Sequence, residues 1–176
     1  DRVGRRIGLE DAPGQAASVA ARLGIETVHC LDPSTVQDES VDILTAHFVL
    51  EHLTDLRGTF ASWRRVVRPG GRLHIAVPNL DCFEARLFGR RWHGLDPPRH
   101  ISFPAGSNLT RLAATAGFEV VRHRNAVFPN TWSASLVATM TGRHRNLLFL
   151  AMTPLGAVLS TLFPQSTSVY LLRRNS

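Results

Sequence analysis

The stretch that decides the fold is VDILTAHFVLEHLTDLRGTFASWRRVVRPGGRLHIAVPN, residues 41–79. It opens with Val41–Ala46, a short apolar run typical of a central strand that is covered on both faces, and it closes with a similar run, Leu73–Val77. The segment between them has apolar residues at helical spacing and must leave the helical conformation before Pro69. A strand, a helix and a second strand in this order predict parallel strands joined by a crossover helix.

The flanking sequence repeats this alternation of short strands and helices. Apolar residues recur at helical spacing over 16–23 and 109–116, with Gly24 and Gly117 where each helix should end. Because no internal repeat or obvious linker interrupts the pattern, we expect a single α/β domain over residues 1–176. Further strands are expected at Val3–Leu9, Thr27–Leu31, Phe118–Arg122 and Ser168–Leu172.

The composition excludes several classes of protein. The 176 residues are 44% hydrophobic, which fits a globular domain, and the two cysteines cannot build a disulfide framework. The net charge is +6, from 20 basic and 14 acidic residues, and every basic residue is arginine. The arginines occur singly or in pairs rather than in clusters, so we expect no nucleic-acid partner.

One apolar stretch, Leu147–Phe163, raises the question of a membrane. Its 17 residues fall short of the roughly 20 that a spanning helix needs. Pro154 interrupts the stretch, so we expect a buried or interfacial helical pair that is broken there. The alternative is a peripheral contact of residues 147–163 with a membrane surface.

Polar residues follow four of the expected strands: Glu10, Asp32, His47 and Asn79. Ligands of open α/β sheets bind at the carboxyl ends of the strands, so these residues together favour a small-molecule site. A carboxylate placed like Glu10 can accept hydrogen bonds from both hydroxyls of an adenosine ribose. Nicotinamide cofactors and S-adenosylmethionine both use this device, and Asp32, which fits an adenine amino contact, favours the methyl donor.

Several motifs together carry a resemblance to a known family. Three of them are VDIL at 41–44, VLEHL at 49–53 and RPGGRL at 68–73. Their order and spacing resemble the fourth strand, the following helix and the fifth strand of class I S-adenosylmethionine-dependent methyltransferases. The segment beyond them, with PN at 78–79, Trp92 and DPPRH at 96–100, is similar to a subgroup common in bacterial lipid, sugar and small-molecule methylation.

The resemblance implies a Rossmann-like, doubly wound and mostly parallel sheet, with S-adenosylmethionine as the cofactor. It implies a cytoplasmic, bacterial enzyme that transfers a methyl group to a small-molecule or lipid-like acceptor. By position in the family pattern, Glu10 would hold the cofactor ribose, while Leu31 and Asp32 would hold the adenine. Ala46 and His47 would line the cofactor pocket at the end of their strand.

Two histidines are candidates for the base that takes a proton from the acceptor. His100 follows two prolines in a loop that, by the resemblance, faces the transferred methyl group, and His52 lies nearer the cofactor. In similar quinone-biosynthesis O-methyltransferases, two acids and a histidine in this segment are associated with a metal. Phe48 stands where the first acid would be, and Glu51 with His52 alone offers too few ligands, so we expect no metal.

The departure from the family concerns its glycine-rich loop. No Gly-x-Gly occurs in the sequence, which begins where the second strand of the family begins. We therefore expect an N-terminally truncated domain that lacks its first strand and its glycine-rich loop. A non-catalytic methyltransferase-like partner module would also explain the missing loop. A nicotinamide-dependent oxidoreductase would share Glu10 but should lack the Leu-Glu-His and Pro-Gly-Gly motifs.

Overall fold

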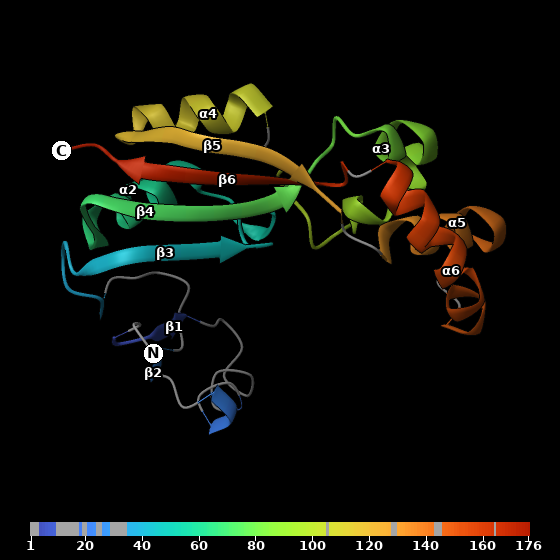
Figure 1. The fold of residues 1–176 in the computed structure, drawn as a ribbon, viewed down its shortest axis with the longest axis horizontal. Coiled ribbons are helices and arrows are strands. Elements are labelled where there is room, and N and C mark those ends of the chain that lie inside the picture. The colour runs from blue at the N-terminus through green and yellow to red at the C-terminus, as the bar shows by residue number, and fades with distance from the viewer. Residues whose placement is uncertain are drawn as a thin grey trace.

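Figure 1 shows the computed structural model, in which a sheet packed against two helices continues at one end into a lobe of three helices. The residues that the structure describes are 4–9, 18, 21–23, 26–28, 35–104, 106–127, 130–142, 146–163 and 165–176.

The sheet has four strands in the order β3 (Val41–His47), β4 (Val67–Pro78), β6 (Thr167–Arg174) and β5 (Phe118–Ala126). Strands β3 and β4 pair in parallel, whereas β6 is antiparallel to both of its neighbours. Strand β5 therefore runs in the same direction as β3 and β4, which confirms the expectation of a mostly parallel sheet. The short strands β1 (Ile7–Leu9) and β2 (Glu26–Val28) form a separate parallel pair.

The Pro-Gly-Gly segment lies within β4, where we expected a turn before a shorter strand. Val41 pairs with Val67, and the next pairing joins Ile43 to Arg72, so the residues between Val67 and Arg72 bulge out of the ladder. Gly70 lies in this bulge with a φ of 73°, a conformation that side chains other than glycine rarely adopt.

Two helices cover one face of the sheet and form the main core with it. Helix α2 (Leu56–Val66) begins where the Asp55 carboxylate accepts a hydrogen bond from the Gly58 N–H. Helix α4 (Gly106–Thr115) ends before Gly117, whose φ is 77°. The core consists mainly of the buried residues Leu50, Phe60, Trp63, Val66, Leu73, Ile75, Leu109, Ala113, Phe118, Tyr170 and Leu172.

The opposite face of the sheet is exposed at its outer strand β3, within the part of the chain that the structure describes. In Figure 1 this face is turned to the viewer, with α2 behind it. Ile43 on β3 is 61% exposed, so the expectation that this strand is covered on both faces is wrong for the described residues.

The lobe consists of α3 (Phe83–Phe88), α5 (Asn130–Thr141) and α6 (Asn146–Leu162), with short 3₁₀ turns at Gly89–Arg91 and His93–Leu95 packed against α5. A third 3₁₀ turn, Leu50–His52, lies beside β4. The expected helical pair broken at Pro154 is wrong, because α6 is one helix that contains this proline. Directly before this proline, the Thr153 hydroxyl donates to the Phe149 carbonyl at 2.9 Å. No helix among the described residues is long and apolar enough to cross a membrane.

Candidate functional site

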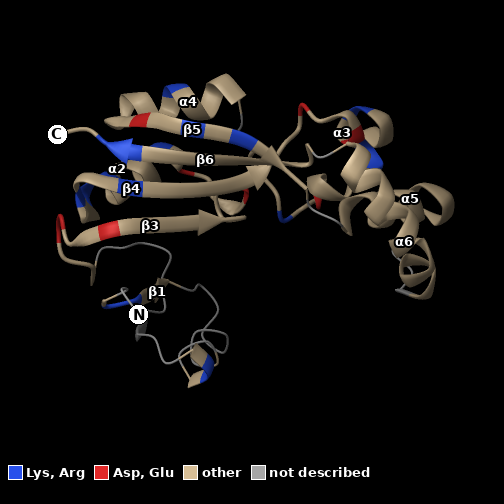
Figure 2. Ribbon diagram, viewed as in Figure 1, with Lys and Arg blue, Asp and Glu red and all other residues tan. Residues whose placement is uncertain are grey.

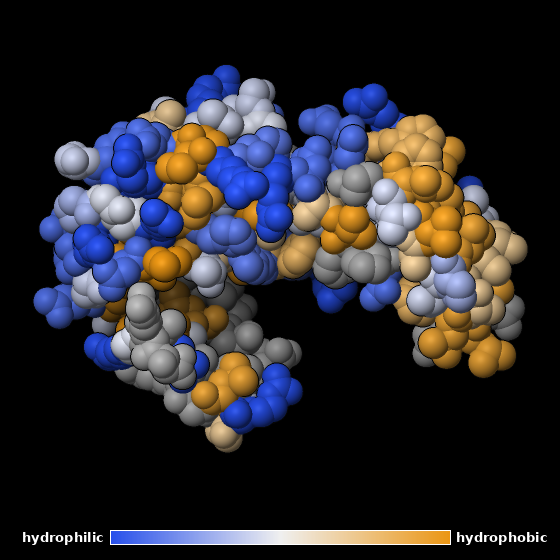
Figure 3. Space-filling view, in the orientation of Figure 1, coloured by the Kyte–Doolittle hydropathy of each residue, from blue (hydrophilic) through white to orange (hydrophobic). Residues whose placement is uncertain are grey.

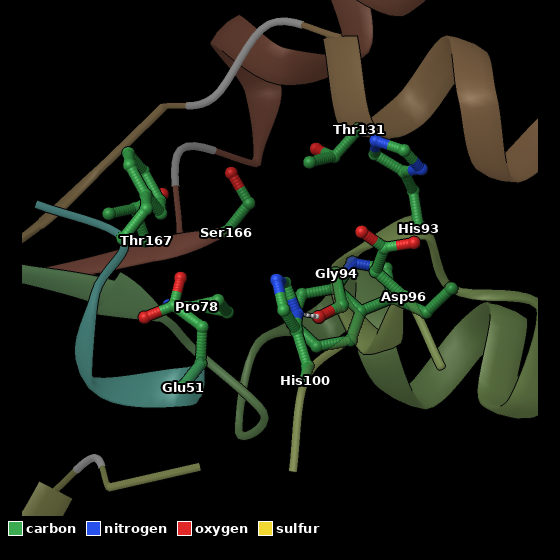
Figure 4. A pocket seen from close by; sticks show the side chains of 11 residues that line it. Glu51, Pro78, His93, Gly94, Asp96, His100, Thr131, Ser166 and Thr167 are labelled. Atoms are coloured by element: carbon green, nitrogen blue, oxygen red, sulfur yellow. Dashed lines mark hydrogen bonds between the residues drawn. The ribbon is translucent and has the colours of Figure 1, made fainter. Parts of the chain in front are cut away.

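A pocket lies at the edge of the sheet where β3 and β4 end and β6 begins (Figure 4). This is the carboxyl edge of the parallel strands, where ligands of open α/β sheets bind. Its lining combines apolar side chains with hydroxyl, carboxylate and imidazole groups. The lining residues are Phe48, Glu51, Pro78, Trp92, His93, Gly94, Asp96, His100, Thr131, Ser166 and Thr167.

Glu51 reaches the pocket because a tight 3₁₀ turn follows β3 and buries both Leu50 and Glu51. The loop after Asp96 is bound to this turn. The Glu51 carbonyl accepts hydrogen bonds from the N–H groups of Ile101 at 2.8 Å and Ser102 at 3.3 Å. The turn and the loop therefore form one hydrogen-bonded unit beside the pocket.

His100 is held in a defined orientation by its own loop. Its backbone N–H donates to the Asp96 carbonyl at 3.2 Å, and its ring Nδ1 donates to the Gly94 carbonyl at 2.8 Å. Because Nδ1 donates, Nε2 is the ring nitrogen that carries no proton when the imidazole is neutral. His52 is held in a similar way, because its Nδ1 lies 3.0 Å from the Arg99 carbonyl.

The Glu51 carboxylate is the unusual group of the site. The side chain is fully buried, and neither of its carboxylate oxygens has a hydrogen-bond partner among the residues that the structure describes. Burial raises the pKa of Glu51, while its backbone and then His100 and His52 act to lower it. A buried carboxylate without a hydrogen bond is costly, and a proton taken up by a neighbouring imidazole would offset that cost.

Glu51, His52 and His100 form a cluster in which the ligand atoms lie within 4.8 Å of one another. The His52 and His100 rings are 4.8 Å apart in an edge-on arrangement. Chemically, such a cluster can share and move a proton, and one carboxylate with two imidazoles can also hold a divalent cation.

Residues 11–123 match the family described as methyltransferase domain. The chain belongs to this methyltransferase family. The predicted family and its Rossmann-like α/β fold are thereby confirmed.

Known relatives agree with this assignment. A probable S-adenosylmethionine-dependent methyltransferase of Mycolicibacterium smegmatis is 34% identical over 121 residues, covering 66% of this chain and 44% of the relative. A malonyl-[acyl-carrier protein] O-methyltransferase of Hahella chejuensis is 32% identical over 84 residues, 47% of this chain and 29% of the relative. The chain thus spans less than half the length of either relative.

Among solved structures, the fold is similar to a geranyl diphosphate C-methyltransferase from Streptomyces coelicolor A3(2). That structure contains Mg²⁺, geranyl diphosphate and S-adenosyl-L-homocysteine. The TM-score is 0.65 at 14% identity, and the match covers 98% of this chain and 65% of the other. At this identity the likeness concerns the fold alone.

The structure brings the two predicted catalytic residues together, and it places neither Ala46 nor His47, the two predicted cofactor residues that it describes, in the lining of the pocket. His100 and His52 adjoin each other, whereas Ala46 is buried in the core. His47 lies outside the pocket lining, with its Nε2 2.6 Å from His74 Nδ1. Glu10, Leu31 and Asp32 lie outside the described residues.

Sequence reasoning missed the hydroxyl side of the pocket, formed by Thr131, Ser166 and Thr167. A polar run immediately before the last strand was visible in the sequence. Its position at the pocket follows from β6 being antiparallel, which brings the start of β6 to the carboxyl edge of its neighbours. Asn79, singled out at the end of β4, instead links two loops, because its amide donates to the Gln165 carbonyl at 2.9 Å.

Next to the pocket, Glu84 is a buried carboxylate whose protonation should affect stability. It accepts hydrogen bonds from the hydroxyls of Thr131 at 2.9 Å and Ser135 at 3.4 Å, which join α3 to α5. Burial raises the pKa of Glu84 to about 6, and these hydroxyl donors offset part of that effect.

We expect Glu84→Gln to flatten the dependence of stability on pH between about 4.5 and 6. In this window the native state keeps a proton that the unfolded state releases, so the free energy of unfolding falls as pH rises, by about 1–2 kcal/mol in total. Urea unfolding from pH 4 to 7.5 measures this, with the exposed Glu119→Gln as the matched control. Superimposable curves for wild type and Glu84→Gln would contradict the assignment.

Proposed function

We propose that this chain is part of an S-adenosylmethionine-dependent methyltransferase whose acceptor binds in the pocket beside Glu51 and His100. The observation that carries the proposal is a buried carboxylate, with no hydrogen bond to a described residue, next to an oriented imidazole at the carboxyl edge of the sheet. Membership of the methyltransferase family supports the reaction class. The relatives support S-adenosylmethionine as the methyl donor.

The donor would bind beside the pocket, on the side of Ala46 and His47, because His47 is followed directly by the pocket residue Phe48. Glu10, Leu31 and Asp32 remain the proposed contacts to its ribose and adenine. When bound, S-adenosylmethionine supplies an electrophilic methyl group on sulfur for in-line displacement by the acceptor. The protein's main task is then to orient the acceptor and exclude water.

We assign to His100 the role of the base that removes the proton of the acceptor. Its Nδ1 is committed to the Gly94 carbonyl, so Nε2 is the nitrogen that can accept a proton from a hydroxyl or amine. The imidazolium formed in this way is stabilised by the Glu51 carboxylate. His52 is the second candidate for this role, and neither histidine requires a metal in this proposal.

The pocket indicates the kind of acceptor. Its volume of about 180 Å³ is below the roughly 300–1,000 Å³ of sites that enclose a drug-sized ligand, so it fits the reacting end of an acceptor. Phe48 and Trp92 give it apolar walls, and Thr131 and Thr167 add hydroxyl groups. These features fit a small-molecule or lipid-like acceptor. We propose a cytoplasmic enzyme that has no nucleic-acid partner. The acyl-carrier-protein substrate in the name of one relative is compatible with an acceptor of this kind.

The strand that pairs with the free side of β3 is proposed to lie outside these 176 residues, together with the glycine-rich loop. Within the described part of the chain, β3 pairs only with β4, and β1 with β2 forms a separate sheet. A strand placed between these two sheets would join them into one. The cofactor site would then be complete only in the full-length protein.

We expect Glu10→Ala in the full-length protein to weaken binding of S-adenosylhomocysteine by about 1.5–3 kcal/mol, because a charged acceptor of two hydrogen bonds is lost. Isothermal titration calorimetry measures the dissociation constant. Glu119→Ala, an exposed acid paired with Arg173 away from the pocket, is the matched control. An unchanged dissociation constant for Glu10→Ala would contradict the assignment of the ribose contact.

A further inference from the structure

Helix α6 buries small residues and exposes large aliphatic ones, which is the reverse of a typical surface helix of a soluble protein. Gly156 and Ser160 are its buried residues among those described, and they are one turn apart on the side facing α5. The packing is close, because a β-carbon at Gly156 would collide with the Ser133 side chain of α5. The large aliphatic side chains point outward, with exposed fractions of 85% for Leu147, 66% for Leu150, 48% for Leu155, 57% for Val158 and 65% for Leu162.

Four threonine hydroxyls of the two helices donate to backbone carbonyls of their own helix. Thr139 and Thr141 of α5 each donate to the carbonyl four residues earlier, at 2.8 Å. On α6, Thr153 donates to the Phe149 carbonyl at 2.9 Å and Thr161 to the Val158 carbonyl at 2.6 Å. Small residues between helices, apolar residues outside and internally bonded hydroxyls are the features of helices that lie in lipid.

The charges of the lobe indicate which lipid surface it fits. From residue 125 to residue 172 the sequence has no acid, and its two charged residues are Arg143 and Arg145, between α5 and α6. Arg86, Arg90 and Arg91, on α3 and the turn after it, are exposed and form no ion pair with a described residue. Figure 2 shows α5 and α6 free of charged residues, and Figure 3 shows hydrophobic side chains over the same lobe.

We infer that the outer face of α6, together with the exposed Met140 of α5, inserts into the surface of an anionic lipid bilayer. The helix has 17 residues, about 25 Å at 1.5 Å per residue, and would lie in the plane of the interface. Its aliphatic side chains would enter the acyl boundary, and the positive charges of Arg86, Arg90 and Arg91 would attract the anionic headgroups.

The pocket adjoins this surface through α5. Thr131, in the first turn of α5, lines the pocket, while Met140 near the other end of the helix is 64% exposed. A lipid-like acceptor could therefore reach the pocket from the bilayer on which the lobe rests. This last step rests on the proposed function, whereas the binding to lipid does not.

Flotation with vesicles tests the inference on the full-length protein without any activity measurement. Vesicles of phosphatidylcholine alone are compared with vesicles containing 30% phosphatidylglycerol. The variant is Leu150→Glu with Val158→Glu, two exposed positions where a charge leaves the core intact. Val121→Glu on β5, at a position 53% exposed and away from the lobe, is the control. Melting temperatures show that each protein is folded.

We expect the wild type and the control to float with the anionic vesicles, less so at high salt, and the double variant to bind about tenfold more weakly or worse. A folded wild type that floats with the vesicles but shows no methyl transfer in a separate assay would contradict the proposed function alone. No flotation of a folded wild type would overturn the inference. A wild type that does not float but forms a dimer, which the double variant abolishes, would show that a second copy covers α6.

Discussion

Replacing His100 by alanine lowers kcat by about 10²–10⁴ in the full-length enzyme, while the affinity for S-adenosylhomocysteine stays unchanged. This result is expected because the loop orients the ring through Gly94 and leaves Nε2 to act as a general base. The acidic limb of the kcat profile between pH 6 and 9, measured at saturating acceptor, should disappear with the base. The melting temperature should stay the same.

The competing role for His100 is to hold its loop by hydrogen bonds to the Gly94 carbonyl. In that case His100→Ala raises KM for the acceptor and lowers the melting temperature, with kcat within about tenfold of wild type. His100→Asn separates the two roles, because an amide can donate to the Gly94 carbonyl but cannot serve as the base. His123→Ala is the matched histidine control, since its ring stacks on Tyr170 away from the pocket.

A metal requirement would also contradict the assignment of His100 as the base. If chelation abolishes activity and a divalent cation restores it, Glu51, His52 and His100 are ligands, as their spacing within 4.8 Å permits. Unchanged activity after chelation is the expected result.

The second large effect is expected from Glu51→Gln, which should lower kcat by about 10²-fold. At roughly 5 Å and an effective dielectric constant of about 20, a carboxylate stabilises an imidazolium by about 3 kcal/mol, which corresponds to that factor. The shape of the side chain is preserved, so the acceptor KM should change little. Steady-state kinetics measure both constants.

Stability provides the distinguishing readout for Glu51. Burial raises the pKa of this carboxyl in the native state, so its ionised form at neutral pH costs stability, and the cost disappears below the pKa of the unfolded chain. Glu51→Gln should therefore leave the protein as stable as wild type or more stable at pH 7. A variant that is both inactive and destabilised would show that Glu51 serves the fold and not the reaction.

The sequence predicted the body of the sheet because local signals there agree with the tertiary structure. Val41–Ala46 became β3, and the helix after Asp55 ended before Pro69, since capping and proline chemistry act within a few residues. The sequence indicated Glu51 and His100, 49 positions apart, as separate candidate residues. Their proximity was not predictable, because it depends on the hydrogen bonds that join the loop to the turn.

Two features depended on information that is absent from local patterns. The direction and insertion of β6 between β4 and β5 bring Ser166 and Thr167 to the pocket, and strand order is set by pairing over the whole chain. The stretch that forms α6 was expected to be a buried or interfacial helical pair, and its pattern did not show that the small residues Gly156 and Ser160 would occupy the interface with α5. An apolar pattern in the sequence does not show whether protein or lipid covers the apolar side chains.

Calorimetric titration of the full-length protein with S-adenosylhomocysteine and, separately, with NAD⁺ tests the assignment most directly. A methyltransferase of this family should bind S-adenosylhomocysteine at one saturable site and should not bind NAD⁺. Residues 1–176 alone should bind S-adenosylhomocysteine at least about tenfold more weakly than the full-length protein, a difference in binding free energy of about 1.4 kcal/mol. Binding of NAD⁺ instead would indicate an oxidoreductase. Binding of neither ligand by the folded full-length protein would indicate a non-catalytic module and would contradict the proposed activity.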